Sequence, residues 1–209
     1  SAPQPSTFPA RDIYYRDQLY WGRIEPQKGV YDFSRYEKLV EECEKRGLRV
    51  MACLALNNTK LYPHVKEPEG RAAYVKYAAA AVEKFKGRNI MWELWNEPNV
   101  MTFWGKHGKV GNSDQYAEEY YQLVKAAVPA MKKADPDCLI LGGSVSNLWS
   151  KSYEWQTFIF NKGILKSGID VWSVHPYGLK SPEDNIEGYA EVRKRMKEAE
   201  AAYLEKKGR

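Results

Sequence analysis

The stretch Trp95-Asn96-Glu97-Pro98-Asn99, which follows the run Asn89-Ile90-Met91-Trp92-Glu93-Leu94, decides the fold. An apolar run that stops at Asn, Glu and Pro is typical of a buried strand that delivers polar side chains into a loop. Catalytic residues of α/β barrels are carried at strand ends of this kind. The end of this strand is therefore the first candidate site.

Strand-like and helix-like segments alternate on both sides of that stretch. We expect buried strands at 12–18, 48–56, 89–94, 138–144 and 169–174. Helical spacing of apolar residues predicts helices at about 32–47, 71–86, 113–134, 153–165 and 182–207. Residues 1–10, with three prolines and two serines, are expected to form an extended arm, and 11–209 a single barrel-derived domain.

Regular alternation of strand and helix leaves two α/β architectures, an open doubly wound sheet or a (β/α)₈ TIM barrel. Neither G-x-G-x-x-G nor G-x-x-x-x-G-K-[ST] follows any expected strand, which removes the main support for a nucleotide-binding open sheet. Polar and aromatic residues instead follow every strand, where parallel strands would gather them into one cleft. They are Trp21, Glu25, Asn57, Asn58, Asn96, Glu97, Ser144, Asn147, His175 and Tyr177.

Composition excludes several other classes of protein. The 209 residues are 44% apolar and 28% charged, as expected of one globular domain. The net charge of +5 comes from Lys and Arg that alternate with Glu along the expected helices, so no nucleic-acid partner is expected. No apolar run is long enough to span a bilayer, and no metal or phosphate motif calls for a cofactor. Cys43, Cys53 and Cys138 are scattered and are expected to be buried apolar residues.

Three motifs together resemble the barrel glycosidases of clan A, most closely glycoside hydrolase family 39. They are Trp21-x-x-Ile24-Glu25-Pro26-x-Lys28-Gly29-x-Tyr31-Asp32-Phe33, Glu93-x-Trp95-Asn96-Glu97-Pro98-Asn99 and Val174-His175-Pro176-Tyr177. Their order and spacing fit over almost the whole chain. The resemblance implies a TIM barrel that retains configuration at a β-linked polysaccharide or oligosaccharide. Such a substrate favours a secreted or extracytoplasmic location.

Glycoside hydrolysis needs one carboxylic acid to protonate the departing oxygen and a second carboxylate on the other side of the sugar. Glu97, at a strand end beside Asn96, is the expected general acid/base. Nearby tryptophans are expected to raise its pKa toward that of a proton donor. In the resembling family, the residue that matches Asn96 bonds the 2-hydroxyl of the sugar.

Glu93 shares a strand face with Glu97, because side chains alternate along a strand. At about 3.3 Å per residue it would lie roughly 13 Å from Glu97, whereas the two carboxylates of a retaining site are about 5 Å apart. We therefore expect Glu93 to be structural and paired with Arg16, since a buried charge needs a partner. Arg16 is equally a candidate for binding in the sugar site.

His175 and Tyr177 share one face of the last strand end with Ser173. The resemblance implies that both line the sugar site; the alternative for His175 is a satisfied core histidine. Trp104 is a candidate for stacking on a sugar ring, as are Trp149 and Tyr62, although a packing role is the commoner outcome for each aromatic taken singly.

In the resembling clan, the acid/base follows the fourth strand of the barrel. If the strand before Glu97 is that fourth strand, the five expected strands correspond to barrel strands 2 to 6. Regions that match strands 1, 7 and 8 are not expected, and a full barrel takes about 250 residues. In the resembling family the nucleophile is a glutamate on the seventh strand, so it is expected to be missing. Glu183 and Glu187, in or near the last helix, are expected to be solvated charges. Open sheet edges predict self-association or a complementing fragment.

Two functions follow from these observations. The first is a retaining glycosidase, complete or as the part that bears the acid/base. The second is a noncatalytic sugar-binding or scaffold protein that keeps the cleft but forms no glycosyl-enzyme intermediate. An unrelated barrel enzyme that uses His175 as a base is a third interpretation, which no accompanying motif supports.

Overall fold

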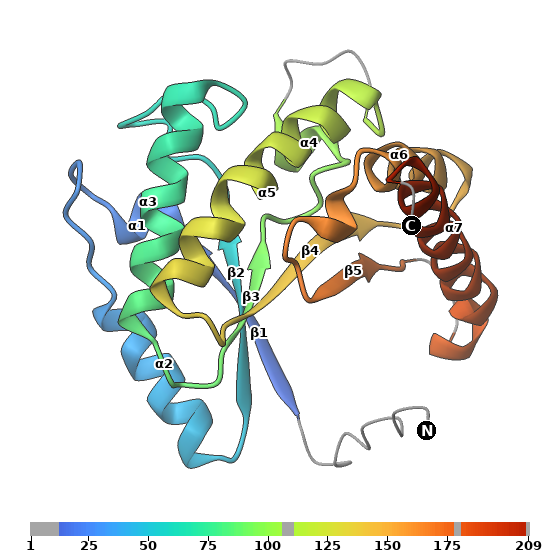
Figure 1. Ribbon diagram of the computed structural model, residues 1–209. Helices are drawn as coiled ribbons and strands as arrows, with labels where there is room; N and C mark the ends of the chain where they lie inside the picture. The colour runs from blue at the N-terminus through green and yellow to red at the C-terminus, as the bar shows by residue number, and fades with distance from the viewer. Residues whose placement is uncertain (1–12, 106–110, 178–180, 208–209) are drawn as a thin grey trace.

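The computed structural model describes residues 13–105, 111–177 and 181–207, so the expected arm at 1–10 lies outside it. Within these ranges the chain forms one parallel sheet whose strands lie side by side in chain order (Figure 1). The strands are β1 (Tyr14–Tyr20), β2 (Arg49–Ala55), β3 (Met91–Leu94), β4 (Leu139–Ser146) and β5 (Val171–His175). Sequential parallel order is that of a barrel wall. The open doubly wound alternative, in which the strand order reverses, is therefore wrong.

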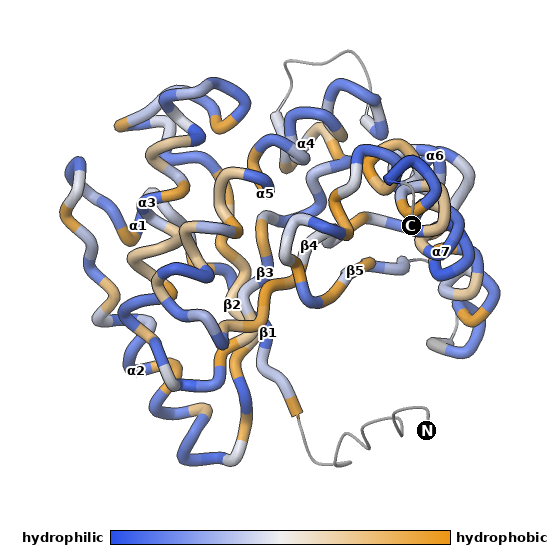
Figure 2. Tube along the Cα trace, viewed as in Figure 1, coloured by the Kyte–Doolittle hydropathy of each residue, from blue (hydrophilic) through white to orange (hydrophobic). Residues whose placement is uncertain are grey.

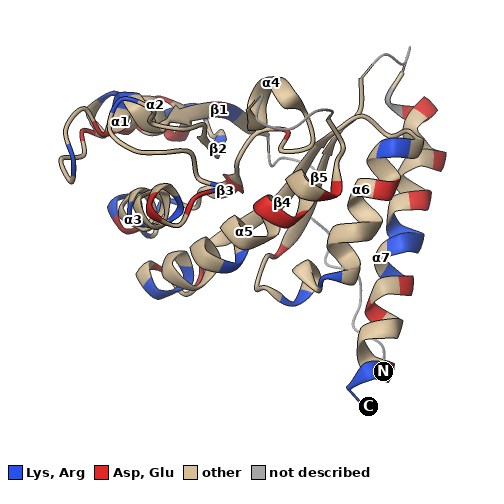
Figure 3. Cartoon of the chain, turned by 90° about the horizontal axis from the view of Figure 1, so that it is seen from above, with Lys and Arg blue, Asp and Glu red and all other residues tan. Residues whose placement is uncertain are grey.

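Helices connect the strands and follow one another around the outside of the sheet (Figure 3). The main ones are α2 (Ser34–Lys45), α3 (Pro68–Lys84), α5 (Asp114–Ala134), α6 (Ser150–Asn161) and α7 (Ile186–Lys206). Consecutive members of the series α3, α5, α6 and α7 contact each other. The fold is thus an arc of a (β/α)₈ TIM barrel, as the sequence predicted.

The core lies between the sheet and these helices. The outward-facing residues of β2 and β3 are buried there: Val50, Ala52, Leu54, Trp92 and Leu94. The strands form the hydrophobic centre in Figure 2, and hydrophilic residues mark the outer turns of the helices. Burial against the helices accounts for the near-continuous apolar character of the strands.

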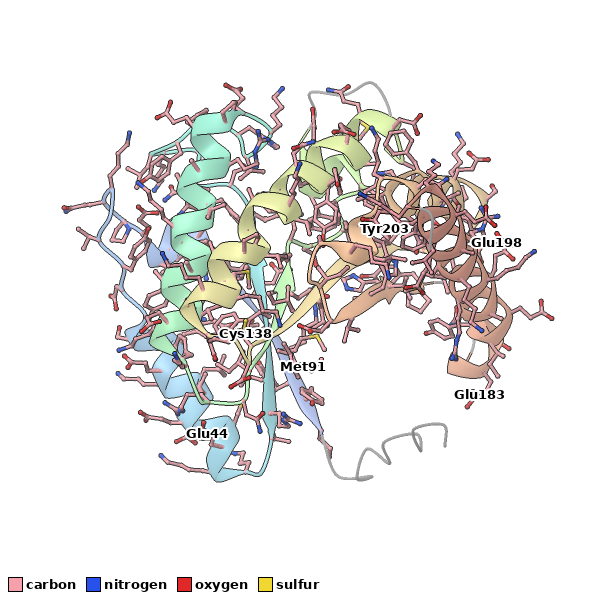
Figure 4. All side chains as sticks on the ribbon, viewed as in Figure 1. Glu44, Met91, Cys138, Glu183, Glu198 and Tyr203 are labelled. Atoms are coloured by element: carbon pink, nitrogen blue, oxygen red, sulfur yellow. The ribbon has the colours of Figure 1, made fainter. Side chains whose placement is uncertain are left out.

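The inner face of the sheet is less completely covered near the amino ends of the strands. Met51 and Met91 are half-buried there, and Leu139 and Val171 are exposed. Figure 4 labels Met91 in this region. In a closed barrel, inward-pointing side chains of this kind stack in layers and fill the interior.

Three buried tyrosines of the outer helices fix the carboxyl ends of successive strands. The hydroxyl of Tyr77 donates to the carbonyl of Leu19 in β1, and that of Tyr74 to Leu54 in β2 at 2.8 Å. The hydroxyl of Tyr120 in α5 donates to the carbonyl of Leu94 at 2.9 Å and accepts from the Gly143 amide at 2.9 Å. The helices therefore support the strand ends that carry the polar residues.

Several element boundaries differ from the predictions. The strand expected at 89–94 begins at Met91, and the loop expected after β1 contains one helical turn, α1 (Trp21–Ile24). The loop expected at 100–112 contains α4 (Met101–Trp104), and its residues 106–110 lie outside the described part. The helix expected at 153–165 divides into α6 and the 3₁₀ turn η1 (Ile164–Lys166), because Gly163 adopts a left-handed conformation at φ 89°. The last helix is preceded by a second 3₁₀ turn, η2 (Pro182–Asn185).

The composition also gave predictions for the three cysteines and for membrane-spanning segments. Cys43, Cys53 and Cys138 are free and buried, as predicted. No helix in the described ranges combines the length and the apolar character needed to cross a bilayer.

Candidate active site

The site begins where β3 ends and the chain turns sharply. Trp95 and Glu97 both have positive φ, at 69° and 46°. Such angles are uncommon outside glycine and cost on the order of 1–3 kcal/mol each. Leu56, Ser144 and Asn147, at or just beyond the carboxyl ends of β2 and β4, also have positive φ. Backbone strain is therefore concentrated on the face of the sheet where the polar residues lie.

Buried side chains hold this strained turn in place. The Trp95 indole is fully buried, donates to the carbonyl of Phe103 at 3.2 Å, and packs on Trp104 with ring centroids 5.1 Å apart. Asn99, also fully buried, ties the turn to the end of β4: its Oδ1 accepts from the Ser146 amide at 2.9 Å and its Nδ2 donates to the Ser146 carbonyl at 3.1 Å. The stretch from Trp95 to Asn99 therefore contains both the Glu97 carboxylate and the buried side chains that hold its turn in place.

Glu93 and Arg16 form an ion pair across the inner face of the sheet. Arg16 on β1 places Nε 2.8 Å and Nη2 2.6 Å from Oε2 of Glu93. The same Nη2 donates to Oδ1 of Asn96 at 2.8 Å. The predicted pairing of Arg16 with Glu93 is confirmed, and it also fixes the amide of Asn96.

His175 lies between the carboxylates of Glu93 and Glu97. Its Nε2 is 3.3 Å from Oε1 of Glu93, and its Nδ1 is 3.0 Å from Oε1 of Glu97. The hydroxyl of Tyr177 donates to the same oxygen of Glu97 at 2.7 Å. The structure thus brings together five of the six predicted site residues, together with Glu93.

The charges of this cluster favour ionised groups throughout. Burial opposes ionisation of Glu93, but hydrogen bonding from His175 and the charge of Arg16 outweigh it and lower its pKa to about 2. Burial would likewise lower the pKa of His175, but its hydrogen bonds to Glu93 and Glu97 raise it above the ordinary value of 6.5. Arg16 and, when protonated, His175 therefore face two carboxylates.

The expectation that tryptophans raise the pKa of Glu97 is wrong for this structure. Burial does act in that direction, but the hydrogen bonds from His175 and Tyr177 outweigh it and hold the pKa of Glu97 below its usual value. The tryptophans of the turn support the backbone, whereas the carboxylate itself is surrounded by donors. Glu97 is accordingly ionised at neutral pH in this arrangement.

The predicted distance between Glu93 and Glu97 is also wrong. A single imidazole ring contacts both carboxylates, so they lie closer than the roughly 13 Å of a continued strand. The reason is that β3 ends at Leu94 and the positive φ angles beyond it turn the chain. Glu93 nevertheless has no exposed surface, so a substrate cannot reach it, in agreement with the structural role expected of it.

Trp149 and Tyr177 present exposed aromatic surface beside this cluster, with 49% and 60% of their residue surface accessible. With Asn147, Leu148 and Asn185 they line a hollow of about 320 Å³. Ligand pockets range from about 300 to 1,000 Å³. Aromatic faces and amides are groups that can contact the ring and the hydroxyls of a sugar.

Other predicted aromatic and acidic contributors lie in the protein interior. Trp104 is fully buried, and its indole donates to Oε2 of Glu119 at 2.6 Å, so it offers no ring face to a sugar. Glu25 is also buried and accepts hydrogen bonds from Trp21, Gly29 and Tyr62. Both therefore support the turns at the strand ends and are not part of an open cleft.

Ser173 was expected on the same strand face as His175, but no partner was predicted for it; its hydroxyl donates to Oε1 of Glu93 at 3.3 Å. The alternation of side chains along β5 predicts the shared face but not the bond to Glu93 on another strand. Glu183, labelled in Figure 4, is exposed on η2, and Glu187 is exposed on α7, as expected. In the ranges that the structure covers, no group of three or more His, Cys, Asp or Glu side chains is arranged to hold a metal ion.

Sequence comparisons relate this chain to known glycoside hydrolases. A family model described as cellulase (glycosyl hydrolase family 5) matches residues 15–207. The chain is 30% identical over 96 residues to a β-xylosidase of Geobacillus stearothermophilus; these residues are 46% of this chain and 17% of the relative.

Solved structures show the same fold. A family 39 glycoside hydrolase from the gut symbiont Bacteroides cellulosilyticus WH2 superposes with a TM-score of 0.63 at 26% identity, over 81% of this chain and 34% of that one. A monomeric β-xylosidase from Caulobacter crescentus CB15 gives 0.65 at 18% identity, over 88% and 43%. The chain thus spans less than half the length of each of these relatives.

Proposed function

Because the chain belongs to the cellulase family (glycosyl hydrolase family 5) of clan A, we propose that it carries the acid/base half of a retaining glycoside hydrolase site. The substrate is a β-linked polysaccharide or oligosaccharide. The observation that carries the proposal is the placement of Glu97: a strained strand end presents its carboxylate beside Asn96, with His175 and Tyr177 bonded to it.

The reaction assigns a role to each of these groups. Glu97 gives a proton to the departing glycosidic oxygen and later removes one from the attacking water. Asn96, held by Arg16, is placed to hydrogen-bond a hydroxyl of the sugar. Such bonds to the 2-hydroxyl strengthen in the transition state.

A second carboxylate is needed to attack the anomeric carbon. Among the described residues, the carboxylate that shares a partner with Glu97 is Glu93, which is fully buried and paired with Arg16. The family resemblance implies a glutamate on the seventh strand of a barrel for this role, and we propose that the nucleophile lies on such a segment. An additional carboxylate near Glu97 would also raise its pKa, since like charges disfavour ionisation, and so prepare it to donate a proton.

The named relatives suggest the sugar. Both the curated relative and the structure from Caulobacter crescentus are β-xylosidases. We propose β-xylosides as the first substrates to assay, with β-glucosides beside them.

Hydrolysis of aryl β-xylosides with good and poor leaving groups tests the role of Glu97. Glu97→Gln should slow hydrolysis of a poor leaving group by about 10²–10⁴-fold, because proton donation is lost, and that of a dinitrophenyl leaving group much less. Glu25→Gln, a buried carboxylate outside the cluster, is the matched control and should keep the wild-type dependence. Equal rates for wild type and Glu97→Gln on both substrates would remove Glu97 from this role.

The ionised state of Glu97 favours a second candidate function, saccharide binding without hydrolysis. An ionised carboxylate accepts hydrogen bonds from sugar hydroxyls but donates no proton. Binding of xylotetraose with no hydrolysis of any aryl glycoside would select this function.

A further inference from the structure

The carboxylate of Glu93 contacts both Arg16 and His175, although no substrate can reach it. Its Oε2 accepts from Arg16, which in turn bonds Oδ1 of Asn96. Its Oε1 faces His175, which in turn contacts Glu97. Asn96 and Glu97 are thus each one side chain removed from the same carboxylate.

We infer that Glu93 is the positioning residue of this site, with one oxygen holding Arg16 against Asn96 and the other holding His175 against Glu97. The inference rests on the proposed function for its consequence in catalysis. The effect of Glu93 on the pKa of His175 can be measured without substrate.

The hydrogen-bond geometry of His175 supports this role. Both of its ring nitrogens face carboxylate oxygens, at 3.0 and 3.3 Å. A neutral imidazole has one N–H donor, so its second nitrogen would turn a lone pair toward an anion; the imidazolium donates from both nitrogens. With both carboxylates ionised, a protonated ring satisfies both contacts, and a buried cation is stabilised by the anions beside it.

The groups around Glu93 and His175 balance in charge. Those that titrate or carry charge come from β1, β2, β3, the turn after β3 and the segment after β5, and they are Arg16, Cys53, Glu93, Glu97 and Tyr177. Burial raises the pKa of the Cys53 thiol well above its usual value, and the bond to Glu97 raises the pKa of Tyr177 to about 12, so both are neutral at pH 7. With His175 protonated, two cations and two anions remain. Removal of the charge of Glu93 would leave an excess cation that His175 can relieve by losing its proton.

Titration of His175 by NMR tests the inference directly. In wild type, the His175 ring should titrate above 6.5. In Glu93→Gln its pKa should fall by roughly 1–3 units, the effect of removing an opposite charge at close range. The amide resonances of Asn96 and Glu97 should shift in the same variant. The His175→Gln variant identifies the ring resonance among the three histidines of the chain.

A matched control separates positioning from general destabilisation. Glu25→Gln also removes a buried carboxylate that accepts several hydrogen bonds, but it should leave the His175 titration unchanged. A wild-type His175 that titrates at or below 6.5 would overturn the inference even if Glu93→Gln failed to fold. An unshifted His175 pKa in folded Glu93→Gln would overturn it as well.

The outcomes for the inference and for the proposed function are distinguishable. A shifted His175 pKa without glycoside hydrolysis in wild type supports the positioning role and contradicts the catalytic one. Hydrolysis that depends on Glu97, together with an unshifted His175 pKa, supports the catalytic function and contradicts the positioning role.

Discussion

Glu97 shows how much of a carboxylate's chemistry depends on its immediate neighbours. The tryptophans near it in sequence are used to build the turn, and its oxygens face His175 and Tyr177. Burial and hydrogen bonding act on its pKa in opposite directions, and here the hydrogen bonds prevail. Proximity in sequence to aromatic residues is therefore a poor guide to the ionisation of a group.

Trp149 presents an exposed aromatic side chain in the hollow that Tyr177 also lines, and we expect it to contact a sugar ring. We expect Trp149→Ala to weaken xylotetraose binding by roughly threefold to tenfold, the loss of about 0.5–1.5 kcal/mol of aromatic contact. Calorimetric titration measures it. Tyr15→Ala, which removes an aromatic of similar exposure (46%) on β1, is the control and should bind as wild type does. If both variants bind equally well, the hollow beside Tyr177 does not receive a sugar.

At the scale of elements, the site depends on the contact between outer helices and strand ends. Tyr120 on α5 joins the end of β3 to β4 through the Leu94 carbonyl and the Gly143 amide. The register of β4 against β5 shifts between Gly142 and Val145, beside this contact. The helix therefore fixes the bulged strand next to the turn that carries Glu97.

Removal of the Tyr120 hydroxyl should cost more stability than the same change at Tyr74. Tyr120→Phe leaves two buried backbone groups without this partner and Tyr74→Phe leaves one, at about 1–3 kcal/mol for each group. The free energy of unfolding in urea measures both. Tyr36→Phe should cost little, since the buried Tyr36 hydroxyl has no hydrogen-bond partner among the described residues. Equal losses in all three variants would contradict the proposed support of the strand ends.

At the scale of the whole molecule, the sheet is an arc with two edges. Within the ranges that the structure covers, β1 pairs only with β2, and β5 only with β4. Ile13 and Val171 are exposed near these edges. Such edges are templates for pairing with another chain, and natural proteins often protect them with lysine.

We expect the chain to self-associate through these edges as its concentration rises. Ile13→Lys should shift the mass in solution toward the monomer, because a charge next to the edge of β1 opposes strand pairing. Light scattering after size exclusion at several concentrations measures it. Val30→Lys places the same charge on an exposed apolar residue of a loop and should leave the association unchanged. A wild-type chain that is monomeric at every concentration would contradict the expectation.

The sequence by itself determined the strand order, the family resemblance and the strand ends that carry the candidate site residues. Apolar runs, helical spacing and the polar residues after each strand depend on local patterns that persist in the fold, and they also gave the Arg16–Glu93 pair. Only the tertiary structure decided the burial of Trp104, the ionisation of Glu97 and the bridge that His175 makes from Glu93 to Glu97. These depend on the sharp turn after Leu94 and on contacts between residues about 80 positions apart, which strand periodicity does not encode. The stretch from Trp95 to Asn99 therefore predicts a carboxylate at a strand end, whereas the tertiary structure determines which charged and polar groups surround it.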